Sequence, residues 1–212
     1  MPGLAGYGGA VVFGAQASTP FTNEAMTETV TDTVFTVTDA ARSMWDDTAA
    51  FVVQKDTAGN GTFITQPASG YTINHAIGRV TFAVAIGGSD IVRVSAGSFF
   101  TKTTVARARE WSLDVERQLE EDTELGSAWE TFLPILGKGS GSVKLNWESG
   151  WFAQMMSTTP RIVLSLQVST AAAQSYEFTA LLSKNGINAG VKGLVDEEFT
   201  FQSVGPVNYL DR

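Results

Sequence analysis

Alternation of apolar and polar side chains with a period of two is the feature of this sequence that most restricts its fold. It recurs in short runs that are separated by turn-forming residues. A period of two gives a strand one buried face and one solvated face, and short turns between such strands favour antiparallel pairing. We therefore predict a mainly β protein, built as an antiparallel sandwich or barrel. The clearest runs are 111–115, 143–147, 162–168, 176–182 and 199–201.

The first half of the chain has strand patterns of its own. Two β-rich segments flank Asn60-Gly61. This dipeptide favours a hairpin turn because both residues tolerate positive φ. Three further short strands are predicted at 71–74, 79–84 and 90–95. This half is therefore also expected to be β-rich.

Two helices are expected. The first is short and lies within residues 38–47, where Thr38 or Asp39 can cap it. The second runs from about Thr123 to Leu133 and is ended by Pro134. Apolar residues fall on one stripe of this second helix, so we predict that they anchor it to a sheet. These predicted core anchors are Leu125, Trp129, Phe132 and Leu133.

The composition argues against several classes of function. The net charge is -8 and the fourteen basic residues are scattered, whereas a grip on nucleic-acid phosphates needs clustered Lys and Arg. There is no cysteine, which removes disulfides and thiolate metal sites, and His75 is the single histidine. No run reaches the ~18 consecutive apolar residues of a membrane span. We therefore expect no association with a membrane.

A dense acidic patch lies between a predicted strand and the second predicted helix. Paired carboxylates can serve glycoside hydrolysis or calcium binding. The spacing of a calcium-binding helix-loop-helix is absent, however, and acids beside a helix N-terminus are favoured by the helix dipole. We therefore expect neither catalysis nor a metal or other cofactor here. The patch consists of Asp114, Glu116, Glu120, Glu121, Asp122 and Glu124.

Two other segments suggest chemistry only weakly. The run GKGSGS at 137–142 lacks the first glycine of a phosphate loop, because Phe132 occupies that position. We interpret this run as a flexible connection. Trp147 and Trp151 could form a platform for a sugar, but packing is the simpler interpretation. The residues therefore favour an interaction or assembly protein and not an enzyme.

The segment WSLDVERQLEEDTELGSAWETFLPILGKGSGSVKLNWES resembles the central signature of the tail tube proteins of long-tailed bacteriophages. In that family a strand leads through an acidic loop to a helix with a tryptophan, then to a Gly/Ser linker and another strand. The segment YEFTALLSKNGINAGVKGLVDEEFTFQSVGPVNY is similar to the closing strands of the same family. Together the two segments lie within 108–210, about half of the chain.

The resemblance implies a β-sandwich or barrel with one flanking helix. It also implies subunits that join into hexameric rings, which stack into a tube that conducts DNA without binding it specifically. The implied partners are further copies of the chain, the tape-measure protein and the proteins at the tail ends. The implied location is the virion tail, after assembly in the cytoplasm of the host bacterium.

The family resemblance also suggests how the chain is divided. If GGAVVFG is the first strand of the tube, then 1–20 and 104–212 form the tube domain and 21–103 form a β-rich inserted module. The alternative is an N-terminal module without any split.

A tube gives the acidic patch a physical role. Negative charge on a channel wall keeps DNA phosphates from adsorbing, and salt screens the repulsion beyond ~10 Å. Residues 104–212 carry fourteen acids and nine bases, a net charge of -5. The predicted channel-lining residues are Asp114, Glu116 and Glu197, unless these carboxylates only solvate the outside. The predicted inter-subunit loop residues are Glu120, Glu121 and Asp122.

Two further functions stay open at the level of sequence. The aromatic residues of the first half could serve a virion decoration or carbohydrate-binding β-module. The carboxylates of 114–124 could serve an acidic hydrolase. Within the tube class, the sequence does not separate a non-contractile tail from a contractile tail or a secretion-system tube.

Overall fold

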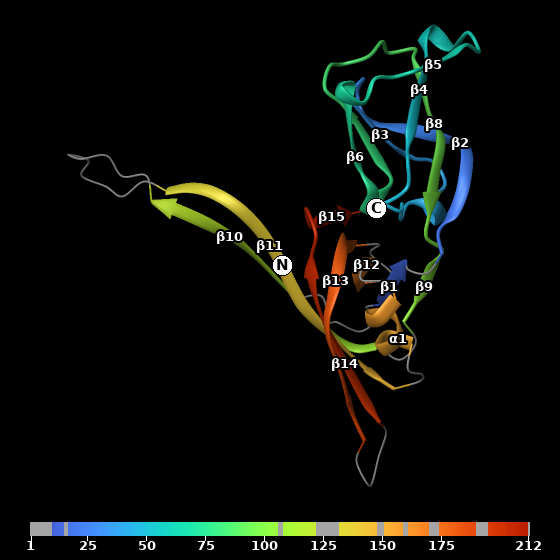
Figure 1. Cartoon of the computed structure of the whole chain (residues 1–212). Helices are drawn as coiled ribbons and strands as arrows, with labels where there is room; N and C mark the ends of the chain where they lie inside the picture. Colours follow the sequence, from blue (N-terminus) through green and yellow to red (C-terminus); the bar gives the residue numbers. More distant parts are fainter. Residues whose placement is uncertain are drawn as a thin grey trace, which may run out of the picture. The chain divides into compact units, whose positions relative to one another are not determined.

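The computed structural model describes residues 10–14, 17–105, 108–121, 132–147, 151–158, 161–169, 174–189 and 195–211 (Figure 1). These residues form antiparallel sheets and one short α-helix, so the predicted fold class is confirmed. No helix in these ranges is long and apolar enough to cross a membrane. The chain divides into two compact units. The first unit is Met1–Val11 with Val105–Arg212, and the second is Val12–Thr104.

The first unit is built on a sheet with strand order β10-β11-β14-β13-β12-β1, in which β15 pairs with β13. All of the registers described between these strands are antiparallel, and β10 and β11 are the first pair of the sheet. The strands are β1 (Ala10–Gly14), β10 (Ala108–Glu121), β11 (Phe132–Asn146), β12 (Arg161–Ser169), β13 (Gln174–Asn188), β14 (Asp196–Ser203) and β15 (Asn208–Asp211).

The core of the first unit lies on one face of this sheet. Phe178 of β13 packs against Phe201 of β14, with ring centroids 5.4 Å apart. Helix α1 (Trp151–Thr158) lies over the same face, because its Phe152 stacks on Phe199 at 4.3 Å. All four phenylalanines are buried, and each contributes about 1.5–3 kcal/mol by leaving water.

The helix predicted at 123–133 is wrong at its C-terminal end, residues 132–133, which is the part that the structure describes. Phe132 and Leu133 belong to strand β11, where they pair with Glu121 and Glu120. Neither residue is therefore a helix anchor. The other candidates of this stretch, Leu125, Trp129 and Asp122, lie outside the described residues.

The Gly/Ser run is also corrected by the structure. Residues 137–142 are not a flexible connection but the middle of β11, which pairs with β10 along the run and with β14 from Ser140 onward. The one α-helix described, α1, follows β11 in the chain, at Trp151–Thr158, where no helix was predicted.

The second unit contains strands in the order β5-β4-β8-β2-β3-β7-β6. Its core is a cluster of buried apolar side chains that includes Phe21, Phe35 and Trp45. The strands predicted at 71–74, 79–84 and 90–95 are confirmed as β6, β7 and β8. The strand bounds are β2 (Thr19–Val30), β3 (Val34–Val37), β4 (Val52–Asp56), β5 (Phe63–Thr65), β6 (Tyr71–Asn74), β7 (Arg79–Phe82) and β8 (Ile91–Phe99).

The short helix expected within 38–47 is a single 3-10 turn, η1 (Ala40–Arg42). The carboxylate of Asp39 caps it by accepting a hydrogen bond from the backbone N–H of Ala41 at 3.0 Å. The hairpin between β4 and β5 is confirmed as well. Its positive φ angles, however, belong to Gly59 and Gly61 and not to Asn60. The remaining 3-10 turns are η2 (Thr57–Gly59), η3 (Ala68–Gly70) and η4 (His75–Ile77).

The chain passes between the two units at two neighbouring points. Strand β1 pairs antiparallel with β9 (Lys102–Thr104), and this register places Gly14 opposite Lys102. Just beyond the pair, the N–H of Val105 donates to the carbonyl oxygen of Val11 at 2.7 Å. The second unit therefore begins and ends on adjacent strands.

Candidate functional site

One face of β10, β11, β14 and the outer part of β13 is polar, and we call it the polar face. Residues directly opposite each other on antiparallel strands share a face of the sheet. The register places Glu110 opposite Lys144, which in turn lies opposite Glu198. The polar face consists of Glu110, Ser112, Asp114, Glu116, Lys138, Ser140, Ser142, Lys144, Lys184, Glu198, Thr200 and Gln202.

The charges of the polar face are mixed. Lys144 Nζ lies 3.2 Å from Glu110 Oε2, and both side chains are exposed, so this ion pair adds little stability. Lys138 lies opposite Glu116. Among the residues of the polar face, acids therefore exceed bases by one. The acids are Glu110, Asp114, Glu116 and Glu198, and the bases are Lys138, Lys144 and Lys184. Asp196, which lies on the same side of β14 as Glu198, forms an ion pair with Arg109.

Asp114 and Glu116, two of the three predicted channel residues, are brought together on this polar face. Both side chains are exposed, and they lie opposite Ser140 and Lys138 of β11. Sequence alternation along β10 was sufficient to place them on one side of the strand. It could not show that a lysine of the next strand faces Glu116, because alternation along one strand does not fix its register with another.

Glu197, the third predicted channel residue, is not on the polar face. It points to the same side of β14 as Phe199 and is only 1% exposed in the subunit. The next residue, Glu198, is the exposed acid of this strand. Burial raises the pKa of the Glu197 carboxyl above its ordinary value, and a hydrogen bond from Asn185 opposes this shift. The carboxylate is thus buried in the subunit, and Glu198 takes its place on the polar face.

A cavity of about 400 Å³ lies at one end of the polar face. Arg109 and Asp196 in its wall form an ion pair, with Arg109 Nη2 2.6 Å from Asp196 Oδ1. Lys144, Lys184, Glu197 and Glu198 also line it. Its wall contains both cationic and anionic residues, so it favours neither phosphate nor metal ions by charge alone. Within the described residues, no three His, Cys, Asp or Glu side chains are grouped so that they could hold a metal ion.

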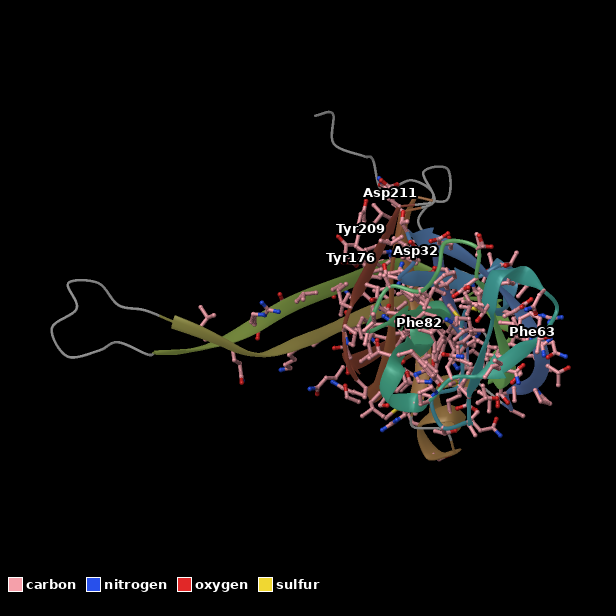
Figure 2. All side chains as sticks on the ribbon, turned by 90° about the horizontal axis from the view of Figure 1, so that it is seen from above. Asp32, Phe63, Phe82, Tyr176, Tyr209 and Asp211 are labelled. Atoms are coloured by element: carbon pink, nitrogen blue, oxygen red, sulfur yellow. The ribbon has the colours of Figure 1, made fainter. Side chains whose placement is uncertain are left out.

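The distal part of β10 and β11 forms a two-stranded arm, 115–121 with 132–139. Figure 1 shows the two strands continuing past the rest of their sheet, and Figure 2 shows the same hairpin from above. On the face opposite to Glu116, the arm exposes Val115 and Leu119, which are 58% and 60% exposed. The residues opposite Val115 and Leu119 on β11 are Gly139 and Pro134. The arm therefore presents two exposed apolar side chains to solvent, with the exposed Arg117 between them on the same face of β10.

Strand β10 is also an edge strand. It is 14 residues long, and in the described part of the chain β11 is its only neighbour. Its outer edge leaves backbone N–H and C=O groups without a strand partner, which is the arrangement that templates pairing with another chain. The predicted inter-subunit loop residues Glu120 and Glu121 lie on this strand and not in a loop.

Aromatic side chains form one surface cluster near the base of the arm. The rings of Trp111 and Tyr176 are 6.4 Å apart, and those of Tyr176 and Tyr209 are 5.4 Å apart. Tyr209 is 52% exposed, and Figure 2 shows it beside Tyr176. The cluster leaves no pattern in the sequence, because it joins three strands that are distant along the chain. Trp147 is 41% exposed, whereas the side chain of Trp151 lies outside the described atoms.

Comparisons with known proteins find neighbours only at the level of structure. No protein-family model and no curated protein matches the sequence. The tail of an empty GTA particle with C6 symmetry is 11% identical, covers 76% of this chain and 95% of its own, and has a TM-score of 0.44. The virion of a native gene transfer agent (GTA) particle is 12% identical, covers 51% of this chain and 88% of its own, and has a TM-score of 0.43.

The chain therefore has structural neighbours among the tail and virion components of gene transfer agent particles. At TM-scores below 0.5, this likeness gives no correspondence between individual residues. What the chain does is therefore inferred from its own surfaces.

Proposed function

We propose that this chain is a structural subunit of a phage-type tail tube, which assembles into stacked hexameric rings and conducts DNA. The sequence resemblance that motivates the proposal spans 108–210, and this range falls in the first unit. The sheet of that unit offers the two surfaces that a tube subunit needs. One is an edge that can join another subunit, and the other is an open polar face.

The free edge of β10 is the observation that carries the proposal. Long exposed edges are a liability for a monomer, and proteins shorten, charge or cover them. This edge is long, and Val115 and Leu119 beside it add exposed apolar surface. A second copy that pairs along β10 would cover both features. Repetition around a ring would cover the β10 edge of every subunit.

The polar face is the surface that we assign to the channel. Its exposed acids Asp114, Glu116 and Glu198 repel phosphate, and the lysines of β11 and β13 reduce that repulsion without reversing it. A wall that is close to neutral and rich in hydroxyl groups holds DNA weakly. It is a weaker anionic lining than the sequence alone predicted.

The remaining parts of the proposal follow from the tube. The partners would be further copies of the chain, the tape-measure protein and the proteins that close the two ends of the tail. The subunit would be located in the virion tail after assembly in the host cytoplasm, and it would have no enzymatic activity.

Electron microscopy of the purified chain tests the assembly. We expect rings or tubes of constant diameter at high protein concentration. Replacement of both Val115 and Leu119 by Asp should abolish these assemblies and leave a folded monomer, because both side chains are exposed in the subunit and contribute little to its own core. A wild-type chain that stays monomeric at all concentrations would contradict the proposal.

A variant on the other face of the arm is the control for the double Asp variant, because it tests whether a change of charge anywhere on the arm prevents assembly. Glu116→Gln changes an exposed residue next to Val115 that points to the polar face. We expect it to assemble as the wild type does. Loss of assembly in this control as well would show that the arm tolerates no change at all, and it would remove the support for a specific apolar contact.

Charge reversal tests the channel. In particles that carry the chain, Asp114→Lys with Glu116→Lys should leave rings intact, because both residues are exposed on the polar face. The same change should slow DNA ejection by adding attraction for phosphate. Unchanged ejection and infectivity in this double variant would contradict the channel assignment.

The carbohydrate-binding alternative gains no support from the second unit. Its large aromatic residues Phe21, Trp45 and Phe82 are buried, and stacking on a sugar needs exposed rings. Phe63 is only partly exposed, and the guanidinium of Arg93 covers its ring at 3.7 Å.

A further inference from the structure

Glu197 is a buried carboxylate with one oxygen left without a hydrogen-bond partner among the described residues. Its Oε1 accepts a hydrogen bond from Asn185 Nδ2 at 2.9 Å. Its Oε2 is the buried oxygen that no described donor reaches. The tube function proposed above does not use this group, because it is enclosed within the subunit.

Asn185, whose side chain donates to Glu197, also has an acceptor oxygen without a donor among the described residues. In the described part of the chain, Asn185 Oδ1 is also buried and without a partner. Asn185 lies on β13 opposite Phe199, and Glu197 lies two residues before Phe199 on the same face of β14. One hydrogen-bonded pair of side chains therefore contains two acceptor oxygens that lack a donor. A buried polar group left in this state destabilises the folded chain.

A single proton would satisfy both oxygens. A protonated carboxyl group has one O–H donor and one acceptor oxygen, and a primary amide has N–H donors and one acceptor oxygen. The two groups can therefore join through two parallel hydrogen bonds. The amide already donates to Oε1, and a proton on Oε2 could be donated to Asn185 Oδ1. Rotation of the amide by half a turn would exchange the two bonds and leave the same pair.

We propose that Glu197 takes up a proton in the folded chain and forms a neutral acid–amide pair with Asn185, which fastens the ends of β13 and β14 to each other. The proton is the ligand of this site. When it leaves, the pair retains one hydrogen bond, and a buried charge faces the amide oxygen. This part of the β13–β14 hairpin is then held less tightly.

The described groups that face Glu197 provide no alternative counter-charge. Its cross-strand neighbours are Leu145 and Ile187, which are uncharged, and α1 contributes Phe152 against Phe199. The charged residues Asp196 and Glu198 point to the other side of β14. Arg109, Lys144 and Lys184 line the same cavity as Glu197, but Arg109 pairs with Asp196 and Lys144 with Glu110. Consistent with this setting, burial raises the pKa of Glu197 and only the bond from Asn185 opposes that shift.

The direction of the pH effect follows from the tighter binding of this proton by the folded state. Below the ordinary glutamate pKa of 4.5, both the folded and the unfolded chain are protonated, so folding incurs no penalty. As the pH rises through the folded pKa, the folded chain has to bury a charge. The contribution of this pair to stability is therefore lost at higher pH.

Unfolding of the full chain by urea at several pH values tests the proposal. Glu197→Gln keeps both hydrogen bonds at every pH, because its amide can donate to Asn185 Oδ1 permanently. We expect its folding equilibrium constant to exceed that of the wild type increasingly from about pH 4 to about pH 8. The gain is about tenfold for each unit that separates the folded from the unfolded pKa. Glu198→Gln, next to it on the exposed face, should show no such trend.

Titration of the glutamate side-chain carboxyl carbons by NMR gives a readout that requires no variant to fold. We expect the carboxyl group of Glu197 to titrate above the ordinary glutamate pKa of 4.5. Titration of Glu197 at or below this value would overturn the proposal. A constant difference in stability between the wild type and Glu197→Gln at all pH values would overturn it as well.

A calcium titration separates a proton from a metal ion at the same two oxygens. We expect no change in the wild-type urea midpoint on addition of Ca²⁺ at about pH 7.5, where carboxylates are ionised and available to a metal. A calcium-dependent rise that disappears in Glu197→Gln would assign the site to a metal ion, and the proton proposal would be wrong.

Discussion

At the scale of single residues, Gly141 shows how a residue with no side chain can be required inside a strand. A Cβ atom at this position would overlap the carbonyl oxygen of Ser112, and it would lie 2.7 Å from Cζ of Phe201. The close approach of β10, β11 and the phenylalanine is possible only with glycine. This explains why a Gly/Ser run, which has low strand propensity, is nevertheless a strand.

Replacement of Gly141 by Ala should therefore destabilise the chain by about 1–3 kcal/mol or more, because backbone and core must shift to admit the methyl group. The midpoint of urea unfolding measures the effect. Gly137→Ala is the matched control on the same strand, since a methyl group there would meet no described atom within 4 Å. Equal losses in the two variants would indicate a general intolerance of β11 to alanine and would contradict the packing explanation.

His75 gives the second unit a pH dependence of the opposite sign to that of Glu197. The His75 ring packs against Phe51, with centroids 5.0 Å apart. Burial lowers the pKa of His75 from 6.5, and the charges of Asp47 and Asp46 reduce this shift. Because the folded chain binds this proton less tightly than the unfolded chain, stability falls as the pH drops below about 6.5.

We expect His75→Gln to flatten the acid limb of a plot of unfolding free energy against pH, below about pH 6.5. The Glu197→Gln variant should instead flatten the alkaline side. An acid limb that is unchanged in His75→Gln would assign it to carboxylates such as Asp46, whose pKa is lowered by hydrogen bonds from Ser18 and Thr48 against the effect of burial.

The position of Glu197 could have been predicted from the sequence. Period-two alternation that places Phe199 and Phe201 in the core also places Glu197 on their side of the strand and Glu198 on the other. The missing partner oxygen could not have been predicted, since it depends on Asn185 of the neighbouring strand. Glu197 was predicted to lie at the surface only because its side chain is charged.

At the scale of elements, the strands were predicted well and the helices poorly. The residues Leu125, Trp129, Phe132 and Leu133 have helical spacing, yet the last two lie in β11. Apolar residues in a long hairpin can reproduce that spacing by chance. Pro134 also favoured the incorrect helix prediction, because proline often follows the end of a helix. Here it is tolerated because β11 at this point has β10 as its only described neighbour.

Helix α1 lacks the charged residues in its first and last turns from which helices are often recognised in a sequence. Trp151–Thr158 has no acid in its first turn and no base in its last turn. Its place in the fold comes from packing. Phe152 and Met155 are buried, and Met156 is 37% exposed.

The two adjacent methionines of α1 give a matched test of this packing. We expect Met155→Ala to destabilise the chain by about 2–5 kcal/mol, the cost of removing a buried large side chain. Met156→Ala removes the same atoms from a partly exposed position, and we expect less than about 1 kcal/mol. Thermal or urea unfolding measures both. A larger loss in Met156→Ala would mean that α1 presents its other side to the sheet.

At the scale of the whole molecule, the order of strands in the sheets was beyond the reach of the sequence. Strand β11 pairs with β14, and β12 with β1, across long stretches of chain. Local patterns fix which face of a strand is apolar, but they hold no information on which strand lies beside it. The mixed charge of the polar face follows from this order, so it too was hidden.

The paired strands β1 and β9 lead to a prediction for the whole chain. Gly14 and Lys102 are opposite each other, so an Asn-Gly turn could join them in place of residues 15–101. We expect the shortened chain to fold, because the sheet of the first unit and its core come from residues outside this range.

Cooperative thermal unfolding and dispersed NMR amide signals would report the fold of the shortened chain. A chain one residue longer, with the turn placed between residues 15 and 102, serves as the control for register, because it shifts the pairing of β1 with β9. If the first variant is no better folded than the control, the first unit depends on the second for its stability.

The side-by-side position of these two crossing points also has a consequence for how such proteins diverge. A lineage could lose, gain or exchange everything between Gly14 and Lys102 in one genetic event and still retain the remaining sheet. Homologues with and without this segment would then align only in two separate pieces, one of which contains the five-residue strand β1. Recognition of distant members would depend on the piece that begins near Val105.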